Sequence, residues 1–340
     1  MTVLDPTLTC AQPLAVNVRV GTAAVMADSS HLAKLAAAIP GTPITARWPW
    51  LAASVAKPAA TEQPWVISVR AGEELVAAAV LLDDASGSVL RTTLAGTAEE
   101  HRGALLAVDD RSAGRLGVAV ADALMGELRE FTIGPVHQGP AVAALLEQLS
   151  VGVIVDEVAV PVVHADPSVP IGMSHGVART LRKAANRMAT DRVHSEIAVI
   201  ERGREITAML PMLESISRDR DIAGGRPSPL DDPYRRRLWQ RRVLSLAAAD
   251  VLRLAMLRLN GQLAAYVLGI EDGVSYRVLE GRYVARWARY APGRVLEAAV
   301  LDAAVGSEDL TMLDWMTGIA PETLLAANDA DALVVIRGRT

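Results

Sequence analysis

The chain has 340 residues, of which 51% are hydrophobic, and its formal net charge is −5. These values are typical of a globular protein with a substantial core, and the length favours two domains over one. The acidic balance argues against nucleic acid as a partner, and no apolar run approaches the ~20 residues that a bilayer span requires. The lone Cys10 allows no internal disulfide, and the first residues lack a signal-peptide pattern, so we expect a cytoplasmic protein.

In the first half, hydrophobic periodicity predicts a strand at residues 14–20, a helix near 27–38 and a loop around Trp50. Three strands separated by short turns follow, with the sequences WVISVR, ELVAAAVLL and SVLRTTLAG. A helix at 114–128, the strand FTIG, a helix at 138–149 and the apolar segment VGVIVDEVAVPVVHA complete this half. The order predicts an α/β architecture of layered α+β type with a largely antiparallel sheet.

The second half repeats this order. A basic helix, HGVARTLRKAANRMAT, precedes the strand HSEIAVIE and two helices that flank a Gly- and Pro-rich loop at 222–232. The clearest hairpin is VLRLAMLRLNGQLAAYVLGI, because Asn260 and Gly261 are the residues that a type I′ turn requires. The strand SYRVLEGRY, a helix that begins at Pro292 and Gly293, and the strands LTMLDW and ALVVIR follow.

Two blocks recur in the same order in both halves. ELVAAAVLLDDASGSVLRTTLAG aligns with QLAAYVLGIEDGVSYRVLEG, and SAGRLGVAVADAL aligns with APGRVLEAAVLDAA. Two matched blocks in one order favour an internal duplication over a chance match. We therefore predict two domains, residues 1–168 and residues 169–340.

The segment RYAPGRVLEAAV, residues 289–300, joins an aromatic and arginine-rich stretch to an apolar helix. Pro292 suits the first turn of a helix, and Gly293 either relieves a tight corner or opens the helix start to a ligand. A helix N-terminus leaves N–H groups without partners and carries partial positive charge. This start is therefore a candidate phosphate site.

Four segments of the second half, at 261–266, 276–283, 288–300 and 313–318, together resemble the acetyltransferase domain of CelD/BcsL-like proteins in the GNAT superfamily. The resemblance implies two tandem GNAT-like domains, each with a mixed, largely antiparallel sheet flanked by helices. It also implies a degenerate first domain and a second domain that takes acetyl-CoA, or another acyl-CoA, as co-substrate.

In that superfamily the pyrophosphate of coenzyme A lies at the start of the helix after the central strand. The resemblance therefore implies a cofactor cradle at this position, in which arginines neutralise phosphates. Its members here are Arg289, Tyr290, Ala291, Pro292, Gly293, Arg294, Val295 and Leu296.

The distribution of reactive side chains favours direct attack of an acceptor on the thioester over a covalent intermediate. Cys10 lies near the N-terminus, the six histidines lie at or before His194, and all five tyrosines lie in the second half. A thioester is already activated, so positioning and removal of one proton carry much of the rate.

Glu280 is the first candidate for the general base, because it lies on the strand just before the cradle. Its structural alternative is an ion pair with Arg282 or Arg277. Asp314 is the second candidate, and capping of a turn at a strand end is its alternative. Tyr283 and Tyr290 are candidates for the general acid, with packing as the alternative.

Three other patterns receive structural interpretations. The basic segment at 235–242 is expected to be a solvated helix face. The segment at 109–117 is either a second phosphate loop or a helix cap, and the cap is favoured. His164, Asp166 and His175 have no recognised metal-ligand spacing, so no metal is expected.

Three functions follow. The first is an acyl-CoA-dependent N- or O-acyltransferase that acts on a small molecule or a cell-envelope sugar, with no nucleic acid partner. The second is a FemAB-like aminoacyl transferase that uses aminoacyl-tRNA. The third is a non-catalytic protein that keeps the GNAT fold. The CelD-like pattern tends to close with a Tyr-Lys pair after the strand that ends near Asp314, and this chain has residues 319–322 there instead. The loop at 222–232 is expected beside the acceptor cleft, as a lid.

Overall fold

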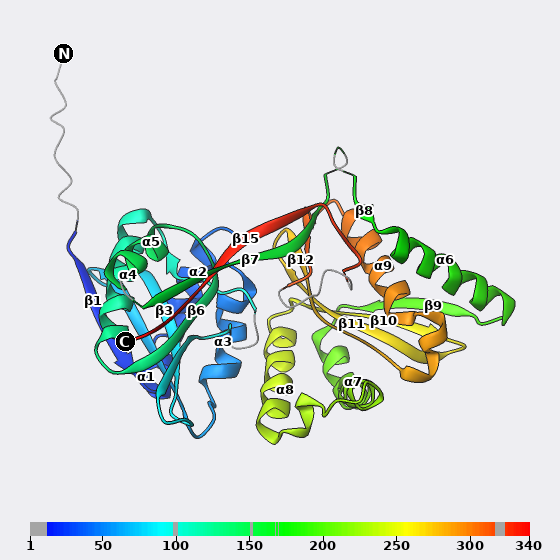
Figure 1. Ribbon diagram of the computed structural model, residues 1–340, viewed down its shortest axis with the longest axis horizontal. Coiled ribbons are helices and arrows are strands. Elements are labelled where there is room, and N and C mark those ends of the chain that lie inside the picture. The colour runs from blue at the N-terminus through cyan, green and yellow to red at the C-terminus, as the bar shows by residue number, and fades with distance from the viewer. Residues whose placement is uncertain (1–11, 98–100, 150–151, 167, 169, 317–323) are drawn as a thin grey trace, which may run out of the picture.

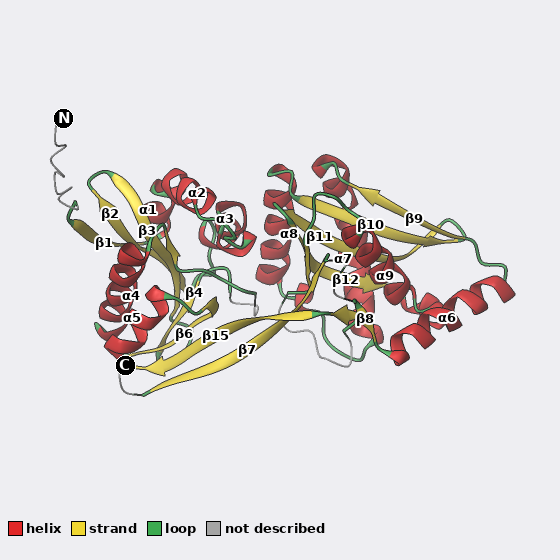
Figure 2. Ribbon diagram, turned by 90° about the horizontal axis from the view of Figure 1, so that it is seen from above, coloured by secondary structure: helices red, strands yellow, loops and turns green. Residues whose placement is uncertain are grey.

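The computed structural model describes residues 12–97, 101–149, 152–166, 168, 170–316 and 324–340. Cys10 and residues 319–322 lie outside the described residues. Two lobes of helices and strands lie side by side, and one continuous sheet runs through both (Figures 1 and 2). The predicted α/β architecture, with a largely antiparallel sheet flanked by helices in each half, is confirmed.

The first half contains the elements up to β7. Their bounds are β1 Leu14–Val20, α1 Thr22–Ala27, α2 Ser29–Ala38, η1 Ile44–Ala46, α3 Trp48–Val55, β2 Glu62–Ala71, β3 Glu74–Asp84, β4 Leu90–Leu94, β5 Leu106–Ala107, α4 Asp110–Met125, β6 Arg129–His137, α5 Pro140–Leu149 and β7 Val153–His164.

The second half contains the remaining elements. Their bounds are β8 Gly172–Met173, α6 His175–Thr190, β9 Ser195–Ile200, α7 Gly203–Ala223, η2 Pro229–Asp231, α8 Pro233–Ala248, β10 Leu252–Leu259, β11 Gln262–Asp272, β12 Ser275–Tyr283, η3 Ala285–Tyr290, α9 Pro292–Val305, β13 Met312–Asp314, β14 Ala326–Ala327 and β15 Asp329–Arg339.

The strand order of the large sheet, β1-β2-β3-β4-β6-β15-β7-β13-β12-β11-β10-β9, has the same pattern from either end. In each half, four antiparallel strands lead to one parallel pair, which is β4 with β6 in the first half and β12 with β13 in the second. The last strand of each half is exchanged: β15 pairs with β6, and β7 pairs with β13. The duplication thus gives one joined sheet, and the predicted boundary at residues 168 and 169 stays a prediction.

Helices cover both faces of the sheet in each half. In the first half, α4 and α5 pack on one face and α1, α2 and α3 on the other. In the second half, α6 and α9 pack on one face and α7 and α8 on the other. Because successive strand residues point to opposite faces, Val267 of β11 packs toward α9 while Leu268 packs toward α7. Burial on both faces explains the unbroken apolar run of β11.

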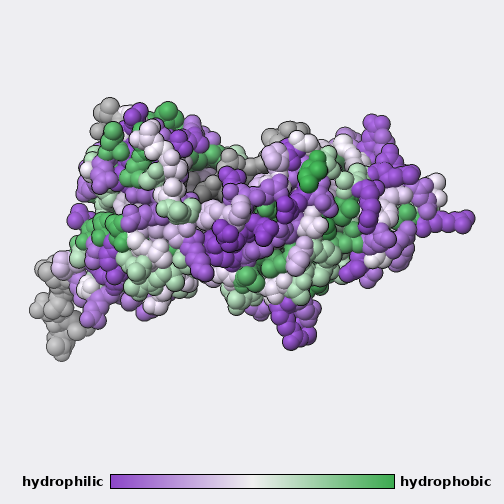
Figure 3. Space-filling model, turned by 90° about the horizontal axis from the view of Figure 1, so that it is seen from below, coloured by the Kyte–Doolittle hydropathy of each residue, from purple (hydrophilic) through white to green (hydrophobic). Residues whose placement is uncertain are grey.

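Helix α8 also holds the two halves together. Arg241 donates to the carbonyl oxygens of Ala53 and Lys57 at the end of α3, both at 3.0 Å, and the guanidinium of Arg242 lies over the ring of Trp50. The basic segment at 235–242 is therefore only partly a solvated face. Seen from below, hydrophilic side chains gather across the middle of the molecule, in the region of α8 (Figure 3).

Local sequence signals located most elements. The predicted hairpin is confirmed, with positive φ at both Asn260 and Gly261, and SYRVLEGRY is β12. The predicted loop around Trp50 is wrong, because this segment is helix α3, stabilised by a fully buried Trp50 side chain. Helix α4 begins before residue 114, because Asp109 caps it.

Candidate active site

A cavity of about 420 Å³ lies in the second half, where the C-terminus of α7 and the N-terminus of α9 approach the middle of β11 and the end of β12. Six of the residues that line it are charged, and the lining includes residues from both faces of the sheet. The lining residues are Arg220, Asp221, Arg226, Tyr266, Val267, Gly281, Arg282, Tyr283, Ala288, Ala291, Pro292, Gly293, Arg294 and Glu297.

An unpaired edge of β12 forms one side of this cavity. The short strand β13 pairs with β12 only from Ser275 to Arg277. In the part of the chain that the structure describes, no strand continues this pairing toward Tyr283. Among the described residues, none pairs with this edge of β12 near Gly281, so the edge suits a ligand that lies along the strand.

The N-terminus of α9 faces the same cavity. The corner before the helix is made by Ala291, whose φ of 46° and ψ of 48° are left-handed, and not by Gly293. An alanine has no side-chain oxygen, and the helix start has no side-chain cap. Among the described residues, the N–H groups of Gly293 and Arg294 in the first turn thus have no acceptor, as an anion site requires.

The two arginines of the predicted cradle have different surroundings. Arg294 lines the cavity and pairs with Glu297 at 2.9 Å. Arg289 instead pairs with Asp191 at 2.8 Å, and the hydroxyl of Tyr290 donates to the same carboxylate. Burial raises the pKa of Glu297, and the nearby Arg294 only partly offsets this effect.

Glu280 lies directly behind the cavity wall, on the face of β12 that is covered by α7 and α8. Its side chain is 11% exposed, and it accepts hydrogen bonds from Trp239 Nε1 at 2.9 Å and from the hydroxyl of Tyr266. Arg282 Nε lies 3.8 Å from the carboxylate. Burial, and then the charge of Glu280, raise the pKa of Tyr266, so the tyrosine remains a proton donor in this pair.

Tyr283 lies at the end of β12 and forms the cavity wall between α7 and α9. The guanidinium carbon of Arg220 is 4.6 Å from the centre of its ring. On the other side, a Cβ atom added to Gly293 would lie 3.4 Å from Tyr283 Cδ1. The Tyr283 ring therefore lies between Arg220 of α7 and the start of α9.

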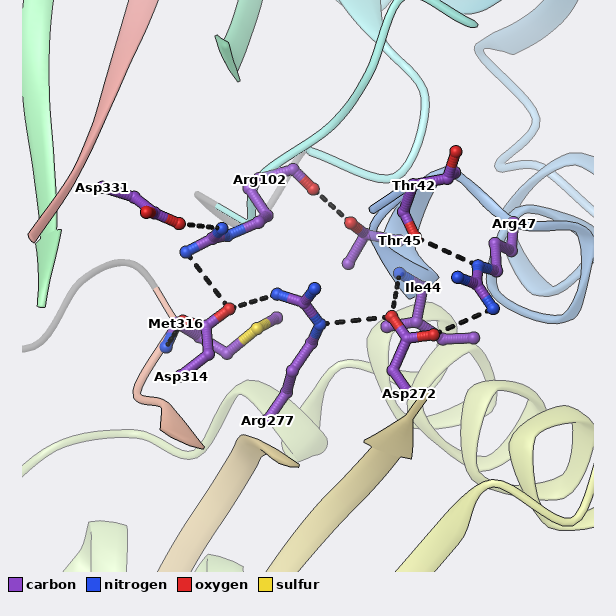
Figure 4. A network of polar contacts seen from close by, with 10 residues as sticks. All are labelled: Thr42, Ile44, Thr45, Arg47, Arg102, Asp272, Arg277, Asp314, Met316 and Asp331. Atoms are coloured by element: carbon purple, nitrogen blue, oxygen red, sulfur yellow. Dashed lines mark hydrogen bonds and ion pairs between the residues drawn. The ribbon is translucent and has the colours of Figure 1, made fainter. Parts of the chain in front are cut away.

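Asp314 lies elsewhere, in a buried polar network between the two halves (Figure 4). Its carboxylate pairs with Arg277 and with Arg102 of the first half, the latter at 3.1 Å, and accepts from the N–H of Met316 at 2.8 Å. Arg102 and Arg277 extend the network through further ion pairs, Arg102 to Asp331 at 2.6 Å, Arg277 to Asp272 at 3.2 Å and Asp272 to Arg47 at 2.9 Å.

The elements around the cavity have the sequence of a known domain. Residues 176–322 match the family model described as an acetyltransferase (GNAT) domain. Residues 176–322 form a GNAT domain. The predicted cradle spans the end of η3 and the start of α9 in this domain, and all residues that line the cavity lie within the matched range.

The fold of the whole chain resembles solved structures with tandem or related architecture. The match with the structure of FemX covers 91% of this chain and 95% of the FemX chain, with 8% identity and a TM-score of 0.58. The match with a tandem GNAT protein from the clavulanic acid biosynthesis pathway covers 96% of this chain and 98% of that protein's chain, with 13% identity and a TM-score of 0.50. At these identities the similarity establishes the fold alone. A search of curated proteins returned no match to this sequence.

The first half differs from the GNAT domain at the corresponding helix start. Asp109 caps α4 by accepting from the N–H of Ser112 at 2.7 Å, and Asp110 adds a second acidic residue to the first turn. A carboxylate already occupies the position that an anionic ligand would take. The helix-cap interpretation of residues 109–117 is confirmed.

The GNAT domain brings together only part of the predicted site. Tyr283, Ala291, Pro292, Gly293 and Arg294 line the cavity, and Glu280 lies behind its wall. Among the described residues, the lining does not include Arg289, Tyr290, Val295, Leu296 or Asp314. The roles assigned to these residues stay predictions.

Sequence reasoning missed several residues of this cavity. Tyr266 belongs to the segment GQLAAY that carried the resemblance, and Glu297 interrupts the apolar run of α9, so both had a local signal. Arg220 had none, because only the packing of α7 against β12 brings it to Tyr283. Arg226, from the predicted lid at 222–232, lines the cavity; closure of that loop stays a prediction.

Within the described ranges, no helix is both long and apolar enough to cross a membrane. The same residues contain no cluster of three or more His, Cys, Asp or Glu side chains with the arrangement of a metal site.

Proposed function

We propose that the protein is an acyl-CoA-dependent acyltransferase of the cytoplasm, with acetyl-CoA as the first donor to test. The donor site belongs to the second domain, and the first domain is degenerate. The observation that carries this proposal is the uncapped start of α9 beside the unpaired edge of β12, in one cavity. The helix start suits the pyrophosphate, and the strand edge suits the extended, amide-containing arm of coenzyme A.

The chain's own residues support direct transfer. The acceptor's amine or hydroxyl attacks the thioester carbon, the C–S bond breaks, and the acceptor loses one proton while the thiolate of coenzyme A gains one. Glu280 is the proposed base, acting directly or through a water molecule. The hydrogen bonds that Trp239 and Tyr266 donate to Glu280 orient its carboxylate. The carboxylate oxygens can still accept a proton from a further donor.

The acceptor is proposed to be a small molecule or a glycan precursor that enters beside the loop at 222–232. Arg226 of this loop and Arg220 at the end of α7 line the cavity opposite α9. Tyr283 lies between these arginines and the proposed phosphate site, where it is the candidate general acid.

Calorimetric titration with acetyl-CoA tests the proposal. Wild type is expected to bind, and Gly293→Val is expected to weaken binding by at least about tenfold, because a branched side chain then covers the helix start. A Cβ atom at Gly293 meets its nearest neighbour at 3.4 Å, so the variant is expected to fold. Gly114→Val is the matched control, since Gly114 has the aligned position in α4 and its Cβ would meet no atom within 4 Å.

The absence of heat with wild type at millimolar acetyl-CoA would reject the acyl-CoA proposal. Equal affinity of wild type and Gly293→Val for acetyl-CoA would instead support acetyl-CoA as the donor and reject the start of α9 as its binding site.

A FemAB-like aminoacyl transfer is the second candidate, and one observation favours it. Helix α6 has an exposed basic face formed by Arg179, Arg182, Lys183 and Arg187, at spacings that place them along one side of the helix. Such a row suits the phosphates of an RNA ligand. Salt-dependent binding of tRNA, together with no binding of acetyl-CoA, would favour this candidate.

A further inference from the structure

The arginines of the cavity are not equivalent. Three of the four that line it have a carboxylate partner: Arg226 pairs with Asp221 at 3.4 Å, Arg294 with Glu297 at 2.9 Å, and Arg282 lies 3.8 Å from Glu280. Arg220 is the exception, because within the described residues its side chain forms no ion pair and no hydrogen bond.

The side chain of Arg220 is nevertheless held in place. It is partly buried in the last turn of α7, and its guanidinium carbon lies 4.6 Å from the centre of the Tyr283 ring. Stacking on an aromatic face fixes the plane of a guanidinium without using its N–H donors. Within the part of the chain that the structure describes, those donors therefore have no acceptor, on a side chain that lines the cavity.

Arg220 also lies near the proposed donor site. The Tyr283 ring, on which the Arg220 guanidinium stacks, would lie 3.4 Å from a Cβ atom added to Gly293 at the start of α9. The position of Arg220 in the last turn of α7 offers another explanation for an arginine at this site, since a cation there interacts favourably with the helix dipole. That interaction alone does not require a side chain stacked in the wall of a cavity.

We propose that Arg220 is the anion-binding side chain of this cavity and that it holds a phosphate or carboxylate group of a ligand. The proposal rests on the proposed function for the identity of the cavity as the transfer site. A partly desolvated guanidinium without a counter-ion gains two charge-assisted hydrogen bonds from such a group. The anion belongs either to the phosphates of the donor or to an acidic group on the acceptor, and these two sources give different results.

The variants for the test are Arg220→Gln, Arg220→Lys and the control Arg204→Gln. Arg204 lies on the first turn of the same helix, is exposed and does not line the cavity. The control therefore removes the same charge from α7 at a distance from the site. Thermal melting of each variant reports whether the fold is kept, and Arg220→Lys keeps the charge if glutamine is not tolerated.

The probes are coenzyme A, pantetheine and inorganic phosphate, measured by calorimetry and by phosphorus NMR. If the anion is a donor phosphate, Arg220→Gln weakens coenzyme A binding by about 10- to 100-fold and leaves pantetheine binding unchanged. If the anion belongs to the acceptor, coenzyme A affinity is unchanged, and inorganic phosphate binds to the coenzyme A complex of wild type but not to that of Arg220→Gln. Arg220→Lys is expected to be intermediate in either case, because it loses the planar fork.

The inference is overturned if a folded Arg220→Gln protein binds coenzyme A and inorganic phosphate as Arg204→Gln does. Failure of the proposed function has a different signature. Wild type then does not bind coenzyme A, whereas inorganic phosphate still binds in a manner that depends on Arg220.

Discussion

Replacement of Asp314 by asparagine distinguishes a residue that joins the two halves from one that removes a proton from the acceptor. The carboxylate is fully buried and contacts the guanidinium groups of Arg277 and Arg102, which are themselves only 5% and 4% exposed (Figure 4). Asparagine keeps the shape of the side chain. It removes the negative charge that balances these two cations and replaces one acceptor oxygen with a donor.

The expected loss is large because the partners remain buried. Removal of one member of a buried ion pair costs about 3–5 kcal/mol of unfolding free energy. With an unfolding entropy of about 2.1 cal/mol/K per residue, a chain of this length loses ~4–7 °C in Tm. Asp331→Asn is the matched control. Asp331 pairs with Arg102 in the same network but is 27% exposed, so its replacement is expected to lower the Tm by less.

Differential scanning calorimetry measures the stability, and release of free coenzyme A from acetyl-CoA measures the chemistry on the same preparations. We expect Asp314→Asn to lower the Tm while its residual rate, measured below the transition, stays close to that of wild type. An unchanged Tm combined with a rate at least about 100-fold lower would refute the structural interpretation and assign the base to Asp314.

Two further predictions concern the carboxylates at the cavity. Glu280→Gln is expected to lower coenzyme A release by about 10²–10⁴-fold with little change in donor affinity, and a lower Tm with a normal rate would instead make Glu280 an ion-pair residue. Burial raises the pKa of Glu297 above its ordinary value, so the folded state binds this proton more tightly than the unfolded state. The resulting stability is present at low pH and is lost as the pH rises through the folded pKa, so Glu297→Gln should gain Tm relative to wild type between about pH 4 and pH 8. A Tm difference that does not change with pH would contradict this reasoning.

Local signals in the sequence predicted those features that depend on a few neighbouring residues. Asn260 and Gly261 fix a turn through their own backbone preferences. The strand SYRVLEGRY was likewise located from its own residues. The start of α9 followed from Pro292 in the same way. The left-handed Ala291 did not, because an alanine has no preference of its own for this region of φ and ψ.

Features that depend on distant segments were beyond this reasoning. The contact of Arg220 with Tyr283 requires the register of β12 and the placement of α7, which no short pattern encodes. Asp314 resembles any strand-end carboxylate in sequence, and only its contact with Arg102 of the other half reveals the buried network. The exchange of the last strands was missed for the same reason, since periodicity predicts a strand but not its partner.

The exchange of β7 and β15 has a consequence for the synthesis of the protein. Ile133 of β6 is paired with Ile336 of β15, which the ribosome adds about two hundred residues later. N-terminal units usually fold while the rest of a chain is still being made, but the first half cannot close its sheet until β15 has been translated. During that interval the edge of β6 is open to other nascent chains, and the slow, long-range pairing makes the step sensitive to chaperones. The rate of folding in the cell is thus expected to depend on the translation of the second half.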